Sequence, residues 1–124
     1  MKSETRLSNI IEALSRHENE AAEEVLERIG TNCDNDEVRR VTAKALVHRN
    51  TYNSLAIVIN KKGKGVNDLS TSVAMSTINE ILSLKDTEQV LKVLAEAEEN
   101  NSDEIIRETA RSVKALIAFS GNVN

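Results

Sequence analysis

The chain has 124 residues, of which 40% are hydrophobic and only 2% aromatic, with no proline and one cysteine, Cys33. This length fits a single domain that buries its core without a metal or disulfide, and a lone cysteine excludes an internal disulfide. Sixteen basic residues against twenty acidic ones give a net charge of -4, which argues against nonspecific nucleic-acid binding by the surface as a whole.

The amino terminus reads Met-Lys-Ser-Glu-Thr-Arg and lacks the apolar run of a signal peptide. The unbroken apolar stretch from Leu55 to Ile59, which no other stretch exceeds in length, is too short to span a bilayer. An unpaired cysteine is typical of a reducing compartment. We therefore expect a cytoplasmic protein that does not associate with a membrane.

Apolar residues recur every three or four positions along nearly the whole chain, which predicts an all-α protein. Capping residues, glycines and the ends of the apolar stripes divide it into seven helices joined by short loops. In chain order we expect helices over 3–16, over 18–30 ending at Gly30, from Asp36 to about Asn50, from Thr51 or Tyr52 to Lys62, from Asn67 or Asp68 to about 85, from Asp86 to about 97, and from Ser102 or Asp103 to Ser120.

One short pattern occurs twice. Residues 36–44 read Asp-Glu-Val-Arg-Arg-Val-Thr-Ala-Lys and residues 103–111 read Asp-Glu-Ile-Ile-Arg-Glu-Thr-Ala-Arg, which places the copies 67 positions apart (103 minus 36). That gap leaves room for one intermediate copy, which we place by aligning Asn67 with Asp36 and Leu69 with Val38. Three such helices, each preceded by a partner, predict hairpins over 18–50, 51–85 and 86–120, with residues 3–16 as a cap.

The repeated helix resembles the second helix of HEAT-type repeats, most closely the bacterial and archaeal branch related to phycobilisome lyases. The shared pattern is an acidic residue, a Val-Arg pair, an alanine and a later apolar residue. The residues that carry it are Asp36, Val38, Arg40, Ala43 and Leu46, and then Asp103, Ile106, Arg107, Ala110 and Val113. Only Ile106-Arg107 keeps the Val-Arg pair intact, because Arg39 intervenes at the first copy.

The resemblance implies one domain over 1–124, a right-handed α-solenoid of about three HEAT-like hairpins with an N-terminal capping helix. It also implies that the second helices line the concave face. In that family the aspartate and arginine of successive repeats tend to bridge neighbouring units. We therefore expect a structural ladder of Asp36, Arg40, Asp103 and Arg107.

Basic residues that remain after the ladder is removed are candidates for binding a partner. They could hold an acidic helix, a peptide or phosphates by charge-assisted contacts. The alternative is that they are solvated and paired with nearby carboxylates. The predicted partner-binding residues are Arg39, Lys44, Arg49, Lys61, Lys62, Lys64, Arg111 and Lys114.

The sequence offers little for catalysis. His17 and His48 lack metal-ligand spacing, and no nucleophile has an accompanying base, so we expect no catalytic residue, metal or cofactor. The run Lys-Lys-Gly-Lys-Gly at 61–65 lacks phosphate-loop spacing and follows a helix, which favours a solvated connector.

These observations favour a non-enzymatic scaffold that binds an acidic protein partner. The first alternative is a nucleic-acid or phosphate binder, and the second is a chromophore-lyase-like accessory protein. Ile117 and Phe119 could cover the end of the stack or contact a second chain, so we expect a monomer or a weak homodimer.

Overall fold

The computed structural model describes residues 2–121, and the side chains of residues 6–120. Within that range it contains no strand and seven α-helices, which confirms the all-α class and the expected number of helices. The helices are α1 (Lys2–Ser15), α2 (Ala21–Leu26), α3 (Asp36–Arg49), α4 (Tyr52–Asn60), α5 (Thr71–Leu82), α6 (Glu88–Asn100) and α7 (Glu104–Gly121), with a π-helical turn η1 (Glu27–Thr31) and a 3-10 turn η2 (Gly65–Asn67).

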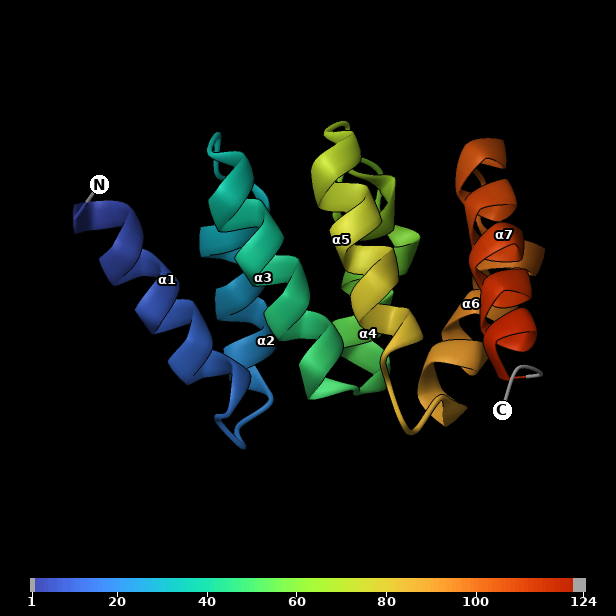
Figure 1. The fold of residues 1–124 in the computed structure, drawn as a ribbon, viewed down its shortest axis with the longest axis horizontal. Coiled ribbons are helices and arrows are strands. Elements are labelled where there is room, and N and C mark those ends of the chain that lie inside the picture. The colour runs from blue at the N-terminus through green and yellow to red at the C-terminus, as the bar shows by residue number, and fades with distance from the viewer. Residues whose placement is uncertain (1, 122–124) are drawn as a thin grey trace.

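The helices form two layers. Helices α1, α3, α5 and α7 lie side by side in one layer, and α2, α4 and α6 lie behind them (Figure 1). Neighbours within the first layer pack against each other in chain order, and α6 packs on both α4 and α7. The helices that carry the repeated pattern therefore share one layer. We call the outward side of α1, α3, α5 and α7 the odd-helix face.

Side-chain caps set where the motif helices begin. The Oδ1 atom of Asn35 accepts a hydrogen bond from the Val38 amide at 3.0 Å, which caps α3. Ser70 caps α5 by accepting from the Val73 amide at 3.4 Å. At α4, Thr51 and Ser54 form a reciprocal capping box. Each cap supplies a partner for an amide that the first helical turn leaves unpaired.

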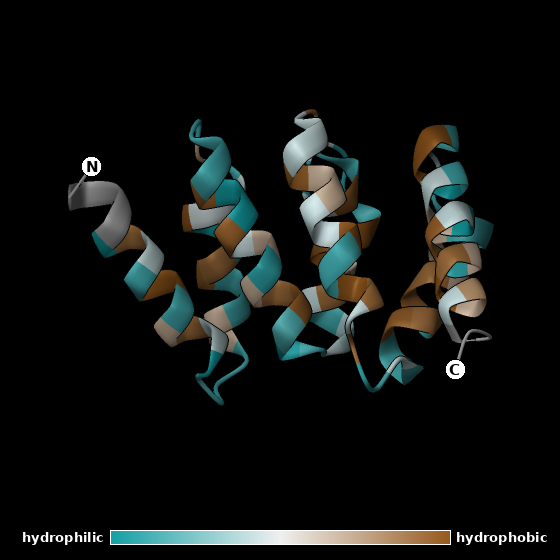
Figure 2. Ribbon diagram, in the orientation of Figure 1, coloured by the Kyte–Doolittle hydropathy of each residue, from teal (hydrophilic) through white to brown (hydrophobic). Residues whose placement is uncertain are grey.

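The core between the layers is aliphatic. Buried hydrophobic residues of α3 in one layer and of α4 and α6 in the other belong to one cluster, and Figure 2 shows brown, hydrophobic segments on helices of both layers. Complete burial of an aliphatic side chain contributes roughly 1.5–3 kcal/mol, and small branched side chains let helices approach closely. The largest fully buried side chains are those of Ile11, Leu26, Leu46, Leu55, Ile59, Ile81 and Leu94.

Polar contacts join the central helix pair to the last one. The hydroxyl of Tyr52 donates to the Glu96 carboxylate, which links the start of α4 to α6. The Asn101 side-chain amide donates to the Asn60 carbonyl at 3.1 Å. The Asn50 side chain donates to the carbonyl of Asp86 at 3.0 Å. These contacts fix both ends of α4 against the segments that flank α6.

The expected start of the fifth helix was wrong. Helix α5 begins at Thr71, and Leu69, expected on the buried stripe, is 95% exposed. The physical reason is that Asp68 is held in a turn, since its Oδ1 accepts from the Ser70 amide at 2.8 Å. Ser70 then caps the helix, and Val73 takes the buried position that Val38 has in α3.

Gly30 does not end the second helix as expected. The coil widens into the π-helical turn η1 and continues to Thr31. A Cβ at Gly30 would lie only 1.9 Å from Oγ1 of Thr42. Glycine is therefore required here because η1 and α3 approach too closely for any side chain.

None of the described helices combines the length and the apolar character that a bilayer crossing requires. The division of the chain into a cap and three repeats stays a prediction.

Candidate interaction surface

The start of α7 shows how the two copies of the sequence pattern correspond in space. Helix α3 begins after Asn35, whose backbone carbonyl accepts the first helical hydrogen bond from the Arg39 amide at 3.1 Å. Helix α7 begins in the same way after Asp103, whose carbonyl accepts from the Arg107 amide at 3.0 Å. Structurally equivalent residues of α3 and α7 are therefore 68 positions apart in the sequence (103 minus 35), one more than the match of the two patterns suggested. This offset pairs the buried Val38 with the buried Ile106, whereas Ile105 is 71% exposed.

In this register Arg39 corresponds to Arg107, and both make the same contact. The Nη1 atom of Arg39 donates to the Cys33 carbonyl at 2.7 Å, and that of Arg107 donates to the Asn101 carbonyl at 2.7 Å. Each carbonyl belongs to the residue six positions earlier. These arginines therefore hold the loop before their own helix.

Arg39 also reaches the next helix pair. Its Nε lies 3.0 Å from Oδ2 of Asp68, which is nearly buried, and its Nη2 contacts Asp36. The hydrogen bond to Asp68 raises the pKa of Arg39 above its usual value and outweighs the effect of burial. Arg39, predicted to bind a partner, thus makes the bridging contact that we expected of Arg40.

The other three residues of the predicted ladder act locally. Arg40 pairs with Glu37 one turn earlier, and this hydrogen bond raises the pKa of Arg40 and lowers that of Glu37. Asp36 contacts Arg39 within α3. The Oδ1 atom of Asp103 accepts from the Ile105 amide at 2.8 Å at the start of α7.

Arg49, another predicted partner-binding residue, is buried in a polar cluster. Its side chain is 6% exposed and its Nε lies 2.9 Å from Oε2 of Glu23, whose side chain is 4% exposed. Its guanidinium also donates to the backbone carbonyls of Leu14, His17 and Asn19. The Thr51 hydroxyl donates to the same Glu23 oxygen at 2.7 Å. Arg49 therefore joins the ends of α1, α2, α3 and α4 and is not accessible to a partner.

The lysines of the 61–65 loop contact η1. Both Lys61 and Lys64 contact Oε2 of Glu27, the latter at 3.1 Å. Burial raises the pKa of Glu27, but the hydrogen bonds from the two lysines outweigh it and hold this pKa below its ordinary value. Lys62 is exposed, and no carboxylate of the described residues contacts it. The loop was expected to be a solvated connector, but Lys61 and Lys64 attach it to Glu27 of η1.

The remaining predicted cations lie on the odd-numbered helices. Lys44 lies 3.8 Å from Glu80, which also contacts His48 at 2.9 Å. Arg111 and Lys114 both face Glu98 of α6, at 3.9 Å and 3.1 Å. The eight predicted partner-binding residues therefore do not form one continuous basic surface.

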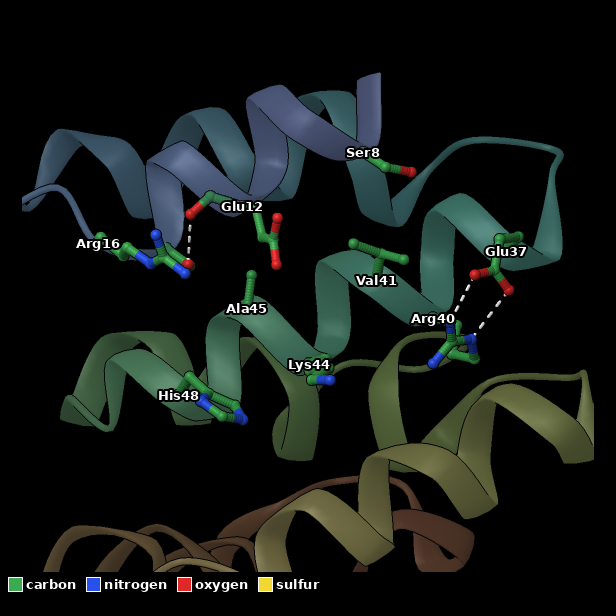
Figure 3. A pocket seen from close by; sticks show the side chains of 10 residues that line it. Ser8, Glu12, Arg16, Glu37, Arg40, Val41, Lys44, Ala45 and His48 are labelled. Atoms are coloured by element: carbon green, nitrogen blue, oxygen red, sulfur yellow. Dashed lines mark hydrogen bonds and ion pairs between the residues drawn. The ribbon is translucent and has the colours of Figure 1, made fainter. Parts of the chain in front are cut away.

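A groove of about 620 Å³ lies between α1 and α3 on the odd-helix face. Figure 3 shows Glu12 and Arg16 on the α1 side, and Arg40, Lys44 and His48 on the α3 side. Its lining residues are Ser8, Glu12, Ser15, Arg16, Glu37, Arg40, Val41, Lys44, Ala45 and His48. Of these, only Lys44 was among the predicted partner-binding residues. Arg16 was missed because it follows the first helix and belongs to no repeated pattern.

A second groove, of about 650 Å³, lies between α2 and α4 in the other layer. Its walls include Glu20, Glu23, Glu24 and Glu27. Glu23 and Glu27 are already paired with basic side chains. The two layers therefore present grooves of different charge, and the one with free cationic groups lies on the odd-helix face.

Comparison with family models, with curated proteins and with solved structures finds no match to this chain. Among the described side chains, no group of three or more histidine, cysteine or acidic residues is arranged to hold a metal ion. The α1–α3 groove and the surface of the odd-numbered helices are therefore the candidate sites of interaction.

Proposed function

We propose that the protein is a right-handed α-solenoid of HEAT-like hairpins that acts as a non-enzymatic binding or scaffolding module. Its ligand is an acidic segment of a protein partner that lies in the groove between α1 and α3. The observation that carries this proposal is the pair of cations on opposite walls of that groove, Arg16 and Lys44.

These two cations are available to a ligand. Arg16 is exposed and has no carboxylate partner among the described side chains. Lys44 is half-exposed, and its 3.8 Å separation from Glu80 leaves it loosely paired. A partner carboxylate that approaches either group forms a charge-assisted contact, which is stronger than a neutral hydrogen bond.

The base of the groove supplies an apolar contact. Val41 and Ala45 lie between the two walls, with Val41 half-buried. An aliphatic side chain of the partner fits above them while acidic neighbours reach Arg16 and Lys44. This arrangement favours an amphipathic helix or an extended segment that carries acidic residues beside an aliphatic one.

Affinity capture from native cells with the full chain as bait tests the proposal. The double variant Arg16→Glu/Lys44→Glu should lose the proteins that wild type retains, because it places carboxylates against an acidic ligand. The matched control is Arg28→Glu, which makes the same exchange at an exposed position on η1. Recovery of the same proteins by the double variant would overturn the proposal.

The nucleic-acid alternative is less well supported because Arg39, Arg49, Lys61 and Lys64 are engaged with carboxylates of the chain itself. It predicts binding of a labelled oligonucleotide that weakens steeply as salt rises. Such binding, with loss in the double variant, would replace the protein partner with a nucleic acid in the same groove.

A further inference from the structure

The α3 wall of the α1–α3 groove carries one group whose charge changes near neutral pH. His48 is 54% exposed and lies one helical turn after Lys44, which lies one turn after Arg40 (Figure 3). Imidazole side chains gain a proton between about pH 8 and 5, whereas carboxylates, lysines and arginines ordinarily keep their charge over that range. Among the described residues that line the groove, His48 alone therefore changes charge there.

Glu80 of α5 connects the basic side chains of this wall. Its Oε2 lies 2.9 Å from Nε2 of His48, and its Oε1 lies 3.8 Å from Nζ of Lys44. The pKa of Arg40 is raised mainly by its hydrogen bond to Glu37, and Glu80 adds to this effect through its charge. One carboxylate is thus shared among basic side chains on three successive turns of α3.

The charges around the groove balance when His48 is neutral. The lining residues together with Glu80 contribute three cations and three carboxylates, which are Arg16, Arg40 and Lys44 and then Glu12, Glu37 and Glu80. Three positive charges minus three negative ones leave a net charge of zero. A proton on His48 raises this net charge to +1, so a single residue decides whether the groove attracts an acidic ligand over its whole length.

The ionisable groups on the other elements near α3 are engaged elsewhere or lie in the other layer. The carboxylates of α2, η1 and the segment before α6 either line the second groove or accept from a backbone amide, and these are Glu20, Glu23, Glu24, Glu27 and Asp86. Helix α4 carries only Tyr52, whose hydroxyl contacts Glu96 of α6, and η2 carries none. His17 follows α1, and its Nδ1 accepts from the Asn19 amide at 3.1 Å outside the groove lining. The charge of the groove near neutral pH therefore depends on His48.

We infer that the groove binds its acidic ligand in a pH-dependent manner, with His48 and Glu80 as the switch. The inference rests on the proposed function and adds how binding is controlled. At the alkaline end of the range a neutral His48 leaves Glu80 shared with Lys44. At the acidic end, protonated His48 forms a charge-assisted contact with Glu80, which leaves Lys44 to the ligand and gives the groove one more positive charge.

Fluorescence anisotropy with a labelled acidic peptide tests the inference on the full chain. The probe is an amphipathic peptide of about 14 residues with glutamates at four-residue intervals beside leucines, and its glutamates stay ionised down to about pH 5.5. At constant ionic strength, wild type should bind it about three- to tenfold more tightly at about pH 6 than at about pH 8. His48→Gln should bind with one affinity at both pH values. The matched control His17→Gln should keep the wild-type ratio.

Glu80→Gln tests the second half of the switch. This variant should bind the peptide more tightly than wild type at about pH 8, because it removes the carboxylate that competes for Lys44. Proton NMR adds a measurement that a merely structural role of His48 would not change. Bound peptide should move the titration of the His48 ring signal to higher pH and leave that of His17 in place, because binding and protonation favour each other equally. Circular dichroism melts at both pH values establish that each variant is folded.

The outcomes separate this inference from the proposed function. Equal affinity of wild type at both pH values, a ratio that His48→Gln retains, or a His48 titration that the peptide leaves unchanged would overturn the switch. If binding is nevertheless lost in Arg16→Glu/Lys44→Glu, the groove remains the binding site. Absence of peptide binding to wild type at about pH 6 would overturn the switch and the proposed acidic ligand together.

Discussion

The buried cluster around Arg49 should be the least replaceable polar contact in the chain. The variant Arg49→Met keeps most of the aliphatic volume but leaves the Glu23 carboxylate, 4% exposed, with only the Thr51 hydroxyl as a partner. Breaking a buried ion pair from one side costs about 3–5 kcal/mol. Three backbone carbonyls at the end of α1 and in the following loop also lose a donor.

Arg40→Met is the matched control, because it removes the same residue type from the same helix. Arg40 is partly exposed, forms its ion pair with Glu37 one turn away, and interacts with Glu80 only through charge. An ion pair of this kind contributes no more than about 0.5 kcal/mol. The two variants should therefore differ by about 3 kcal/mol in the free energy of unfolding.

Urea denaturation followed by circular dichroism measures this difference. With a slope of about 1–1.5 kcal/mol per molar urea, the midpoint of Arg49→Met should lie roughly 2–3 M below that of Arg40→Met. The double variant Glu23→Leu/Arg49→Met should recover much of the loss, since it removes both charges together. Free energies of unfolding for Arg49→Met and Arg40→Met that agree to within about 1 kcal/mol would refute the reasoning.

Three further expectations concern packing and titration. Gly30→Ala should cost about 1–3 kcal/mol in urea unfolding, because its Cβ meets Thr42, and the cost should fall in a Thr42→Ala background; an equal cost in both backgrounds would contradict the contact. The pKa of Glu27 is lowered in the folded chain, so its ion pairs stabilise the fold above about pH 4.5 and lose this effect as the pH falls through the folded pKa. The stability deficit of Glu27→Gln at pH 7 should therefore shrink as the pH falls below about 4.5, and a deficit that did not change with pH would count against those ion pairs. Tyr52 is the only tyrosine and tryptophan is absent, so absorbance reports its titration directly. The hydrogen bond to Glu96 raises the pKa of Tyr52 above 10.0, and Glu96→Gln should return it toward that value; an unchanged titration would exclude the bond in solution.

The helical class and most helix ends could be predicted because their causes are local. The aliphatic period of three to four residues, the cap at Thr51 and the acidic first residue Asp36 are visible within one helical turn of sequence. The start of α5 was missed for a reason that is only partly local, since the turn at Asp68 is also held from a distant helix. Asp68 looked like the first residue of a helix, but its carboxylate is held by Arg39, 29 positions earlier.

The register of the repeat was misjudged by one position for a related reason. The letters Asp-Glu match at 36 and 103, whereas the residues that cap the two helices are Asn35 and Asp103. Two adjacent arginines, Arg39 and Arg40, then made the wrong alignment look consistent. Which of them bridges to the next helix pair depends on a contact that the sequence pattern does not contain.

The partner-binding residues were the hardest to predict because charge pairing depends on distant segments. Arg49 finds its carboxylate 26 positions earlier in the chain, and Lys61 finds Glu27 34 positions earlier. The sequence did contain one indication of a buried ion pair, because Glu23 lies between Ala22 and Leu26 on the apolar side of α2. An acid at such a position requires a basic partner.

The contacts of Arg39 have a consequence for how the chain opens in its native state. Arg39 connects its own loop to the next helix pair, whereas Arg107, among the described residues, contacts only its own loop. No described side chain of α7 after Val113 is buried. Amide hydrogens there should exchange with solvent well before those of α3, so the order of exchange along the chain should follow the number of neighbouring helices that each helix contacts.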